Sequence, residues 1–162
     1  PTVHAVLVGI NTYPLLAPRG GGGPSHNLHG CVNDVERWYR LLTAPPFCVP
    51  RCNVTVLTEA AATRDAILGA LKRCHTDATR SLSTPGVLRP TDLVWFHFSG
   101  HGSRTPVHSN MAVEGIVPFD RWVATPFHAN RDIMDVELRA WAKAITAMCY
   151  KLVMVMDCCH GG

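Results

Sequence analysis

Hydrophobic residues occur in short runs along this chain, and each run ends at polar or glycine-rich positions. Four such runs predict buried strands at residues 3–9, 53–57, 93–98 and 152–156. Unbroken apolar runs of this length are typical of strands that are covered on both faces. A further short strand, or the remnant of one, is expected at 116–118.

The segments between these runs carry hydrophobic residues at intervals of three and four, which predicts helices. The first helix is expected to begin at Asn33 and to end before a pair of prolines, and Thr63 is the expected N-cap of the second. A third helix is predicted at about 136–148. Strands that alternate with helices predict an α/β fold of three layers, with a mostly parallel central sheet and helices on both faces. With no internal repeat, we expect residues 1–162 to form one domain.

Composition excludes several classes of protein. Apolar residues make up 47% of the 162 residues and charged residues 17%, which is typical of a folded domain. The net charge is +3, and the lysines and arginines are scattered, so we expect no nucleic-acid partner. No apolar stretch approaches the roughly 20 residues of a membrane helix, so no membrane partner is expected.

The cysteines indicate a reducing compartment. There are seven, an odd number, and none form a CxxC pair. No signal-peptide pattern opens the chain, so we expect free thiols and a cytoplasmic protein. Cys74 and Cys149 fall at apolar helical positions and are expected in the core. Cys48 and Cys52 lack the second pair of ligands that a metal site needs.

Two of the predicted strands end in a reactive side chain beside glycine. Residues 99–102 read SGHG, and residues 157–162 read DCCHGG. If the two strands are parallel neighbours, these ends meet at one edge of the sheet, where ligands of open α/β sheets bind. A cysteine beside a histidine is a nucleophile with its base. The pattern therefore predicts a dyad of His101 and Cys159.

Other interpretations of the same residues remain open. Cys158 and Cys159 are also compatible with two buried strand-end thiols or with a vicinal disulfide, and His101 with a turn histidine that bonds to backbone. A zinc or redox module of Cys158, Cys159 and His160 is a further alternative, although adjacent ligands rarely fit a tetrahedral site. Two matched strand ends favour the dyad.

The two motifs, together with residues 4–11 (HAVLVGIN) and 30–34 (GCVND), resemble the caspase-like cysteine peptidases of the C14 group, and specifically metacaspases. The resemblance covers Val3 to Gly162, as the large (p20) part of the peptidase domain. It implies a caspase-like fold and a thiol protease, a cysteine-type endopeptidase that is made as a zymogen. It also implies that a p10-like part beyond Gly162 completes the site.

The family pattern implies a role for each matching residue. His101 becomes the general base or acid and Cys159 the nucleophile, which forms an acyl-enzyme. The backbone N–H groups of Gly102 and Cys159 become the oxyanion donors. Asp34 and Asp157 match the acidic pocket positions of enzymes that cut after Arg or Lys, and two carboxylates suit a guanidinium or an ammonium. Without the motif, Asp34 would be read as a first-turn acid that offsets the helix dipole.

The resemblance raises calcium as an activator, while the chemistry itself requires no cofactor. Asp120 and Asp135 match two aspartates that hold calcium in many metacaspases, but Val136 stands where another acid is usual. Calcium prefers six to eight oxygens, so Asp132 or Glu137 would have to contribute. The alternative is that Asp120 caps a turn and Asp135 caps a helix.

The family also suggests how the protein behaves as a whole. We expect a monomer that cleaves proteins or peptides with a basic P1 residue and that matures by self-cleavage in loops 76–90 or 121–131. The alternative is a catalytically silent caspase-like domain that binds protein partners. Such relatives normally lack the cysteine or the histidine, and this chain keeps both.

Overall fold

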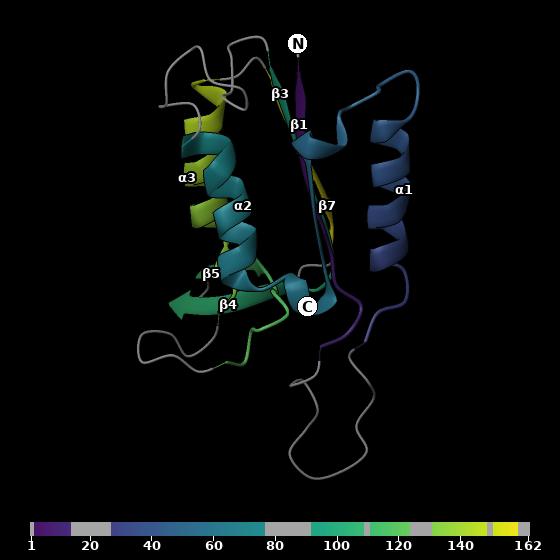
Figure 1. The fold of residues 1–162 in the computed structure, drawn as a ribbon. Helices are drawn as coiled ribbons and strands as arrows, with labels where there is room; N and C mark the ends of the chain where they lie inside the picture. The colour runs from purple at the N-terminus through teal and green to yellow at the C-terminus, as the bar shows by residue number, and fades with distance from the viewer. Residues whose placement is uncertain are drawn as a thin grey trace.

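The computed structural model describes residues 2–13, 27–76, 92–108, 111–123, 131–148 and 151–158. Among these residues, a parallel sheet of four strands runs through the centre in the order β2-β1-β3-β7 (Figure 1). The strands are β1 (Val3–Gly9), β2 (Val54–Thr58), β3 (Leu93–Ser99) and β7 (Lys151–Asp157). They coincide with the four apolar runs, so the predicted sheet is confirmed.

Helices cover both faces of this sheet. Figure 1 shows α1 (Cys31–Thr43) on one side and α2 (Arg64–Thr76) with α3 (Asp135–Thr146) on the other. The expected three-layer α/β architecture is therefore confirmed. No helix within the described ranges is both long and apolar enough to cross a membrane.

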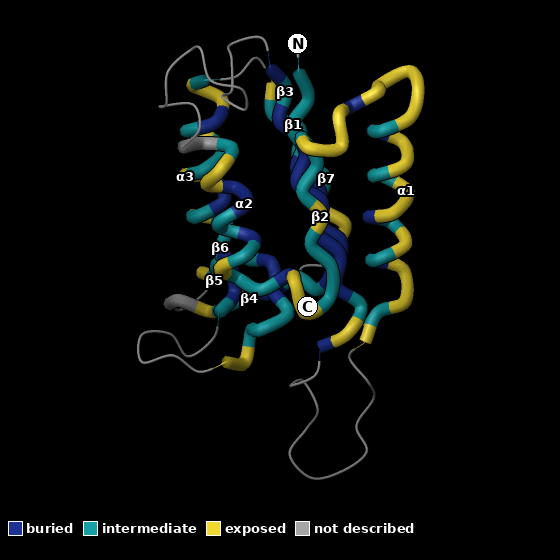
Figure 2. Tube along the Cα trace, in the orientation of Figure 1, coloured by how far each residue is buried: buried dark blue, intermediate teal, exposed yellow. Residues whose placement is uncertain are grey.

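Successive residues of the central strands supply two separate cores, because strand side chains alternate between the faces. Phe96 and Phe98 of β3 are fully buried in the cluster that includes Ile67 and Leu71 of α2. Leu7 of β1 belongs instead to the cluster on the α1 side. Each large side chain buried in this way stabilises the fold by roughly 1.5–3 kcal/mol. Figure 2 shows the resulting buried band along the sheet.

A small antiparallel sheet, in the order β4-β5-β6, follows the first of the two motifs. Its strands are β4 (Gly102–His108), β5 (Met111–Ile116) and β6 (Ile133–Met134). The sequence predicted only a remnant at 116–118, and that prediction was wrong in extent, because β5 ends at Ile116. The β4 segment reads GSRTPVH, and polar residues with an internal proline do not give an apolar run.

Two of the helix starts have identifiable caps. α1 begins at Cys31, earlier than the predicted Asn33, and the Cys31 N–H donates to Asn11 Oδ1 at 2.9 Å. This cap comes from the loop after β1, so local sequence does not reveal it. Before α2, the Thr63 hydroxyl accepts the N–H of Ala66 at 3.2 Å, as expected for an N-cap.

Candidate active site

The ends of β3 and β7 lie side by side at the carboxyl edge of the central sheet. Ser99 pairs with Asp157 in the parallel register, and the Gly100 N–H donates to the Asp157 carbonyl at 3.2 Å. His101 follows directly on this edge. The SGHG segment and the first residues of DCCHGG, Asp157 and Cys158, therefore lie at the same edge of the sheet, which is where an α/β sheet binds its ligands.

The thiol side of this edge is described as far as Cys158. The Cys158 thiol is half-buried and packs against the large core cluster on the α2 side. Cys159, the predicted nucleophile and oxyanion donor, and His160 lie outside the described residues. Gly102, the other predicted oxyanion donor, is the first residue of β4 and pairs with Ile116. The dyad and the oxyanion site stay predictions.

His101 is in contact with Tyr13, which lies in the loop after β1. The His101 N–H donates to the Tyr13 hydroxyl at 2.9 Å, and the two ring centroids lie 4.8 Å apart. The His101 carbonyl accepts the N–H of Val117 at 3.0 Å. Sequence reasoning missed Tyr13, whose only signal was its place just past the carboxyl end of a predicted strand.

Asp34 and Asp157, the two acids of the predicted substrate pocket, line the same pocket of about 570 Å³. Asp34 lies in the first turn of α1, and Asp157 is the exposed last residue of β7. The rest of the lining is largely apolar and comes from Arg37, Trp38, Leu41, His97, Val155 and Met156. The fold therefore brings two carboxylates, far apart in sequence, to one pocket with an apolar wall.

Asp34 contacts Ser99 of the first motif and two neighbours on α1. The Ser99 hydroxyl donates to Asp34 Oδ2 at 3.2 Å. Arg37 Nη1 lies 3.8 Å from Asp34 Oδ1, but the arginine is largely exposed, so this pair is weak. Burial raises the pKa of Cys31, and the Asp34 charge adds to the rise against the hydrogen bond from Ser99. Sequence reasoning did not assign Ser99 or Cys31 a place beside the pocket acid.

His97 forms part of the inner wall of this pocket. It is 1% exposed, and its ring centroid lies 5.8 Å from that of Trp38. Within the described part of the chain, neither of its ring nitrogens has a hydrogen-bond partner. Burial lowers the pKa of His97, although the charges of Asp34 and Asp157 act in the opposite direction. The imidazole is therefore neutral at physiological pH.

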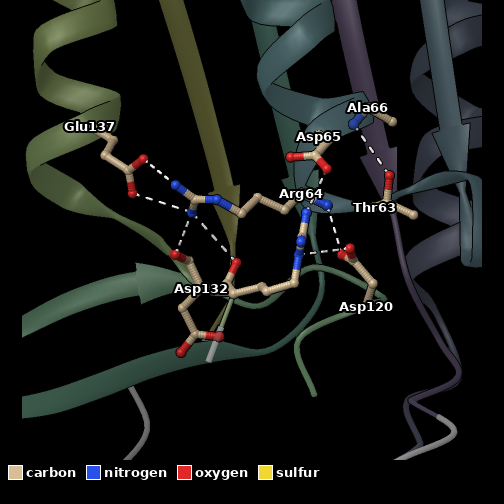
Figure 3. Close-up of polar contacts among 8 residues, drawn as sticks. Thr63, Arg64, Asp65, Ala66, Asp120, Asp132 and Glu137 are labelled. Atoms are coloured by element: carbon tan, nitrogen blue, oxygen red, sulfur yellow. Dashed lines mark hydrogen bonds and ion pairs between the residues drawn. The ribbon is translucent and has the colours of Figure 1, made fainter. Parts of the chain in front are cut away.

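The two aspartates of the predicted calcium site are each paired with arginine. Asp120 Oδ1 accepts the backbone N–H of Arg64 at 2.7 Å, so Asp120 caps α2 (Figure 3). Its other oxygen pairs with Arg131 Nε at 2.9 Å. Asp135 is the first residue of α3 and pairs with Arg139 at 2.9 Å. Each of the two aspartates is therefore already engaged by an arginine side chain.

The two additional candidates, Asp132 and Glu137, are also in contact with arginines. Glu137 forms an ion pair with Arg64, and Asp132 pairs with Arg121 at 3.0 Å. Burial raises the pKa of Asp132 against the effects of Ser103 and of the nearby arginines. Among the described residues, no group of three or more His, Cys, Asp or Glu side chains could hold a metal ion. All four acids therefore pair with arginines in this structure, and the calcium site and calcium activation stay predictions.

Comparisons with known proteins identify the family of this chain. Residues 4–162 match the family model of the metacaspase, peptidase C14 domain. The chain is 30% identical to metacaspase-4 of Arabidopsis thaliana over 162 residues, which covers 99% of this chain and 34% of the relative. It is 31% identical to metacaspase-1 of Plasmodium falciparum over 169 residues, covering 98% of this chain and 24% of the relative.

A solved structure supports the fold independently. A crystal structure of a protein from Geobacter sulfurreducens superposes with a TM-score of 0.66 at 21% identity, covering 100% of this chain and 52% of that one. The chain spans about a third or less of the two metacaspases compared above. Since the family model matches nearly its whole length, the chain belongs to the metacaspase family of C14 peptidases.

Proposed function

We propose that this chain carries the catalytic part of a cysteine endopeptidase that cuts peptide bonds after Arg or Lys. The observation that carries the proposal is the shared pocket of Asp34 and Asp157, which adjoins the strand ends that lead to His101 and Cys159. Membership of the metacaspase family supports the reaction class. The pocket supports the preference for a basic side chain, because two carboxylates attract a cation.

In the proposed reaction, His101 takes the proton of the Cys159 thiol, and the thiolate attacks the carbonyl carbon of the scissile bond. The N–H groups of Gly102 and Cys159 then stabilise the oxyanion. His101 returns the proton to the leaving amine, which departs and leaves an acyl-enzyme. Water, activated by the same histidine, hydrolyses the thioester and frees the thiol.

The shape of the pocket supports a long basic side chain in P1. Trp38 and Leu41 provide an apolar wall along which the aliphatic part of an arginine or lysine packs. The charged end then meets the carboxylates of Asp34 and Asp157. A guanidinium offers five N–H donors and can pair with both acids at once.

Further properties of the whole protein follow as proposals from the same family pattern. A p10-like part completes the substrate cleft, and self-cleavage in loops 76–90 or 121–131 converts a zymogen to the active form. We propose that the enzyme works as a cytoplasmic monomer, with calcium as the activator to be tested.

The test is cleavage of three matched fluorogenic peptides that end in Arg, Lys or Asp. It uses the full-length protein, with calcium and with a chelator, beside a Cys159→Ala variant. We expect cleavage of the Arg and Lys peptides that disappears in the variant. Cleavage of the Asp peptide instead would contradict the pocket assignment, and no cleavage under any condition would favour a catalytically silent binding domain.

A second set of variants tests the pocket. Asp34→Asn and Asp157→Asn should each lower kcat/KM for the Arg peptide by about 10- to 100-fold, the value of one charged hydrogen bond. Glu36→Gln is the matched control, since this exposed acid of α1 pairs with Arg40 and does not line the pocket. Equal effects of Asp34→Asn and Glu36→Gln would point to a general charge effect.

A further inference from the structure

Three hydrogen bonds join Tyr13, His101 and Val117 in a closed ring. The His101 N–H donates to the Tyr13 hydroxyl at 2.9 Å, and that hydroxyl donates to the Val117 carbonyl at 3.4 Å. The Val117 N–H donates back to the His101 carbonyl at 3.0 Å. Both backbone polar groups of His101 are therefore fixed, one of them directly by the tyrosine.

The tyrosine ring also fills the space around the histidine. The Tyr13 and His101 rings lie 4.8 Å apart at an interplanar angle of 52°. At Gly100, a Cβ atom would come within 2.7 Å of the Tyr13 hydroxyl and 2.8 Å of the Phe98 ring. Only glycine allows this approach, so the backbone before His101 is packed directly on Tyr13.

Tyr13 and the preceding Thr12 are themselves held by side chains from other segments, Asn27 before α1 and Glu59 after β2. Its N–H donates to Asn27 Oδ1 at 3.1 Å, and the preceding Thr12 N–H donates to the Glu59 carboxylate at 2.9 Å. The side chain is 4% exposed. Burial raises the pKa of Tyr13 well above its ordinary value, while the hydrogen bond from His101 acts in the opposite direction. The hydroxyl therefore keeps the proton that it donates to Val117.

We propose that Tyr13 is a positioning residue for His101. Its hydroxyl fixes the backbone of the histidine, and its ring limits the positions of the imidazole. The inference rests on the proposed function, which takes His101 as the proton carrier of the dyad. Proton transfer depends on the placement of the carrier to a fraction of an ångström, so a small displacement lowers the rate without weakening substrate binding.

The experiment compares Tyr13→Phe with Tyr39→Phe in the full-length protein. Tyr39 lies on α1, away from His101, so Tyr39→Phe is a control that removes a tyrosine hydroxyl from a different site. The first readout is the NMR signal of the His101 imidazole, assigned by its loss in His101→Ala. The second is the separation of kcat from KM for the Arg peptide.

We expect the His101 signal to move and broaden in Tyr13→Phe and to stay unchanged in Tyr39→Phe. We also expect kcat to fall about tenfold in Tyr13→Phe, with KM within about twofold of the wild type. A KM that rises while kcat holds would overturn the proposal, because Tyr13 does not line the acidic pocket.

The NMR readout separates this inference from the proposed function. If the wild type cleaves no peptide, the function fails, and the His101 signal alone decides the role of Tyr13. An unchanged His101 signal, or an unchanged kcat in an active enzyme, would overturn the role. If Tyr13→Phe does not fold, Asn27→Ala is the second variant, since it removes only the side-chain acceptor of the Tyr13 N–H and keeps the tyrosine. It should change both readouts in the same direction as Tyr13→Phe.

Discussion

His97 is the residue whose chemistry conflicts most with its surroundings. A buried polar group without a partner costs about 1–3 kcal/mol, and both ring nitrogens of His97 are in that position among the described residues. His97 lies in the wall of the acidic pocket, against Trp38, so this unfavourable burial occurs next to the proposed substrate site. Such residues are a frequent feature of functional sites.

The lowered pKa of His97 predicts acid sensitivity. The unfolded chain binds a proton near the ordinary imidazole pKa of 6.5, whereas the folded chain binds it only at lower pH. The contribution of His97 to the free energy of unfolding is therefore fully present above pH 6.5. It is lost progressively as the pH is lowered below that value. The slope is at most about 1.4 kcal/mol per pH unit from this one group.

Urea unfolding between pH 5 and 8 measures this slope. We expect His97→Gln to flatten the acid limb, because glutamine does not titrate. His29→Gln, at an exposed histidine, is the matched control and should keep the wild-type slope. The same slope in the wild type and in His97→Gln would show that other groups cause the loss.

At this scale, the sequence identified candidate site residues but not the residues that contact and orient them. His101, Asp34 and Asp157 stand in motifs, and the parallel register explains why motifs at two strand ends share an edge. The contact between Tyr13 and His101 depends on how two loops pack, and no local pattern encodes it. Positioning contacts of this kind need coordinates.

Between elements, β1 packs tightly against α1 at Gly9. A Cβ atom at Gly9 would lie 2.5 Å from the Cys31 carbonyl oxygen and 2.7 Å from a methyl group of Val35. The first turn of α1 therefore rests directly on the last residue of β1. This contact sets the distance between the sheet and the helix that carries Asp34.

Gly9→Ala should lower the free energy of unfolding by about 1–3 kcal/mol, because the helix backbone must move to admit the methyl group. Gly69→Ala on α2 is the matched control, since its Cβ would meet only the end of the Arg73 side chain at 3.7 Å. Alanine is the better helix former, so Gly69→Ala should stabilise the chain by up to about 1 kcal/mol. Urea unfolding measures the change in the free energy of unfolding for each variant. Changes of the same sign in the two variants would contradict this packing argument.

The elements themselves were predictable where burial imposes a pattern. The central strands are covered on both faces, and their apolar runs mark them in the sequence. The antiparallel β4–β5 pair lies outside the central sheet and has Pro106 and charged residues such as Arg104 in its pairing region. Its strands are defined by mutual hydrogen bonds and carry little hydrophobic signal, so sequence reasoning missed β4 and found only the end of β5.

Over the whole molecule, a cluster of arginines and acids adds a polar connection between α2, α3 and the small sheet, which also share the large core cluster. Arg64 of α2 pairs with Glu137 of α3 and donates to the Asp132 carbonyl at 2.6 Å. Arg131, before β6, links Asp65 of α2 at 2.6 Å to Asp120 of the turn after β5. Figure 3 shows these contacts between the two helices and the small sheet.

Arg131 should contribute more to stability than an ordinary surface arginine. Its side chain is 13% exposed and that of Asp120 is 16% exposed, so removing Arg131 leaves a largely buried carboxylate without this cationic partner. Loss of one partner of a buried pair costs about 3–5 kcal/mol, and the partial exposure of this pair reduces the expected cost to about 2–3 kcal/mol. We therefore predict a loss of that size in Arg131→Gln.

Arg139→Gln is the matched control, because Arg139 and Asp135 form an exposed pair one helical turn apart, worth about 0.5 kcal/mol or less. Urea is the suitable denaturant, since guanidinium salt would screen the ion pairs. Similar losses in the two variants would mean that the cluster acts as a set of independent surface pairs. A larger loss in Arg131→Gln, reduced when Asp120→Asn is added, would show that the arginine acts by neutralising that carboxylate and so fixes the turn after β5 to the start of α2.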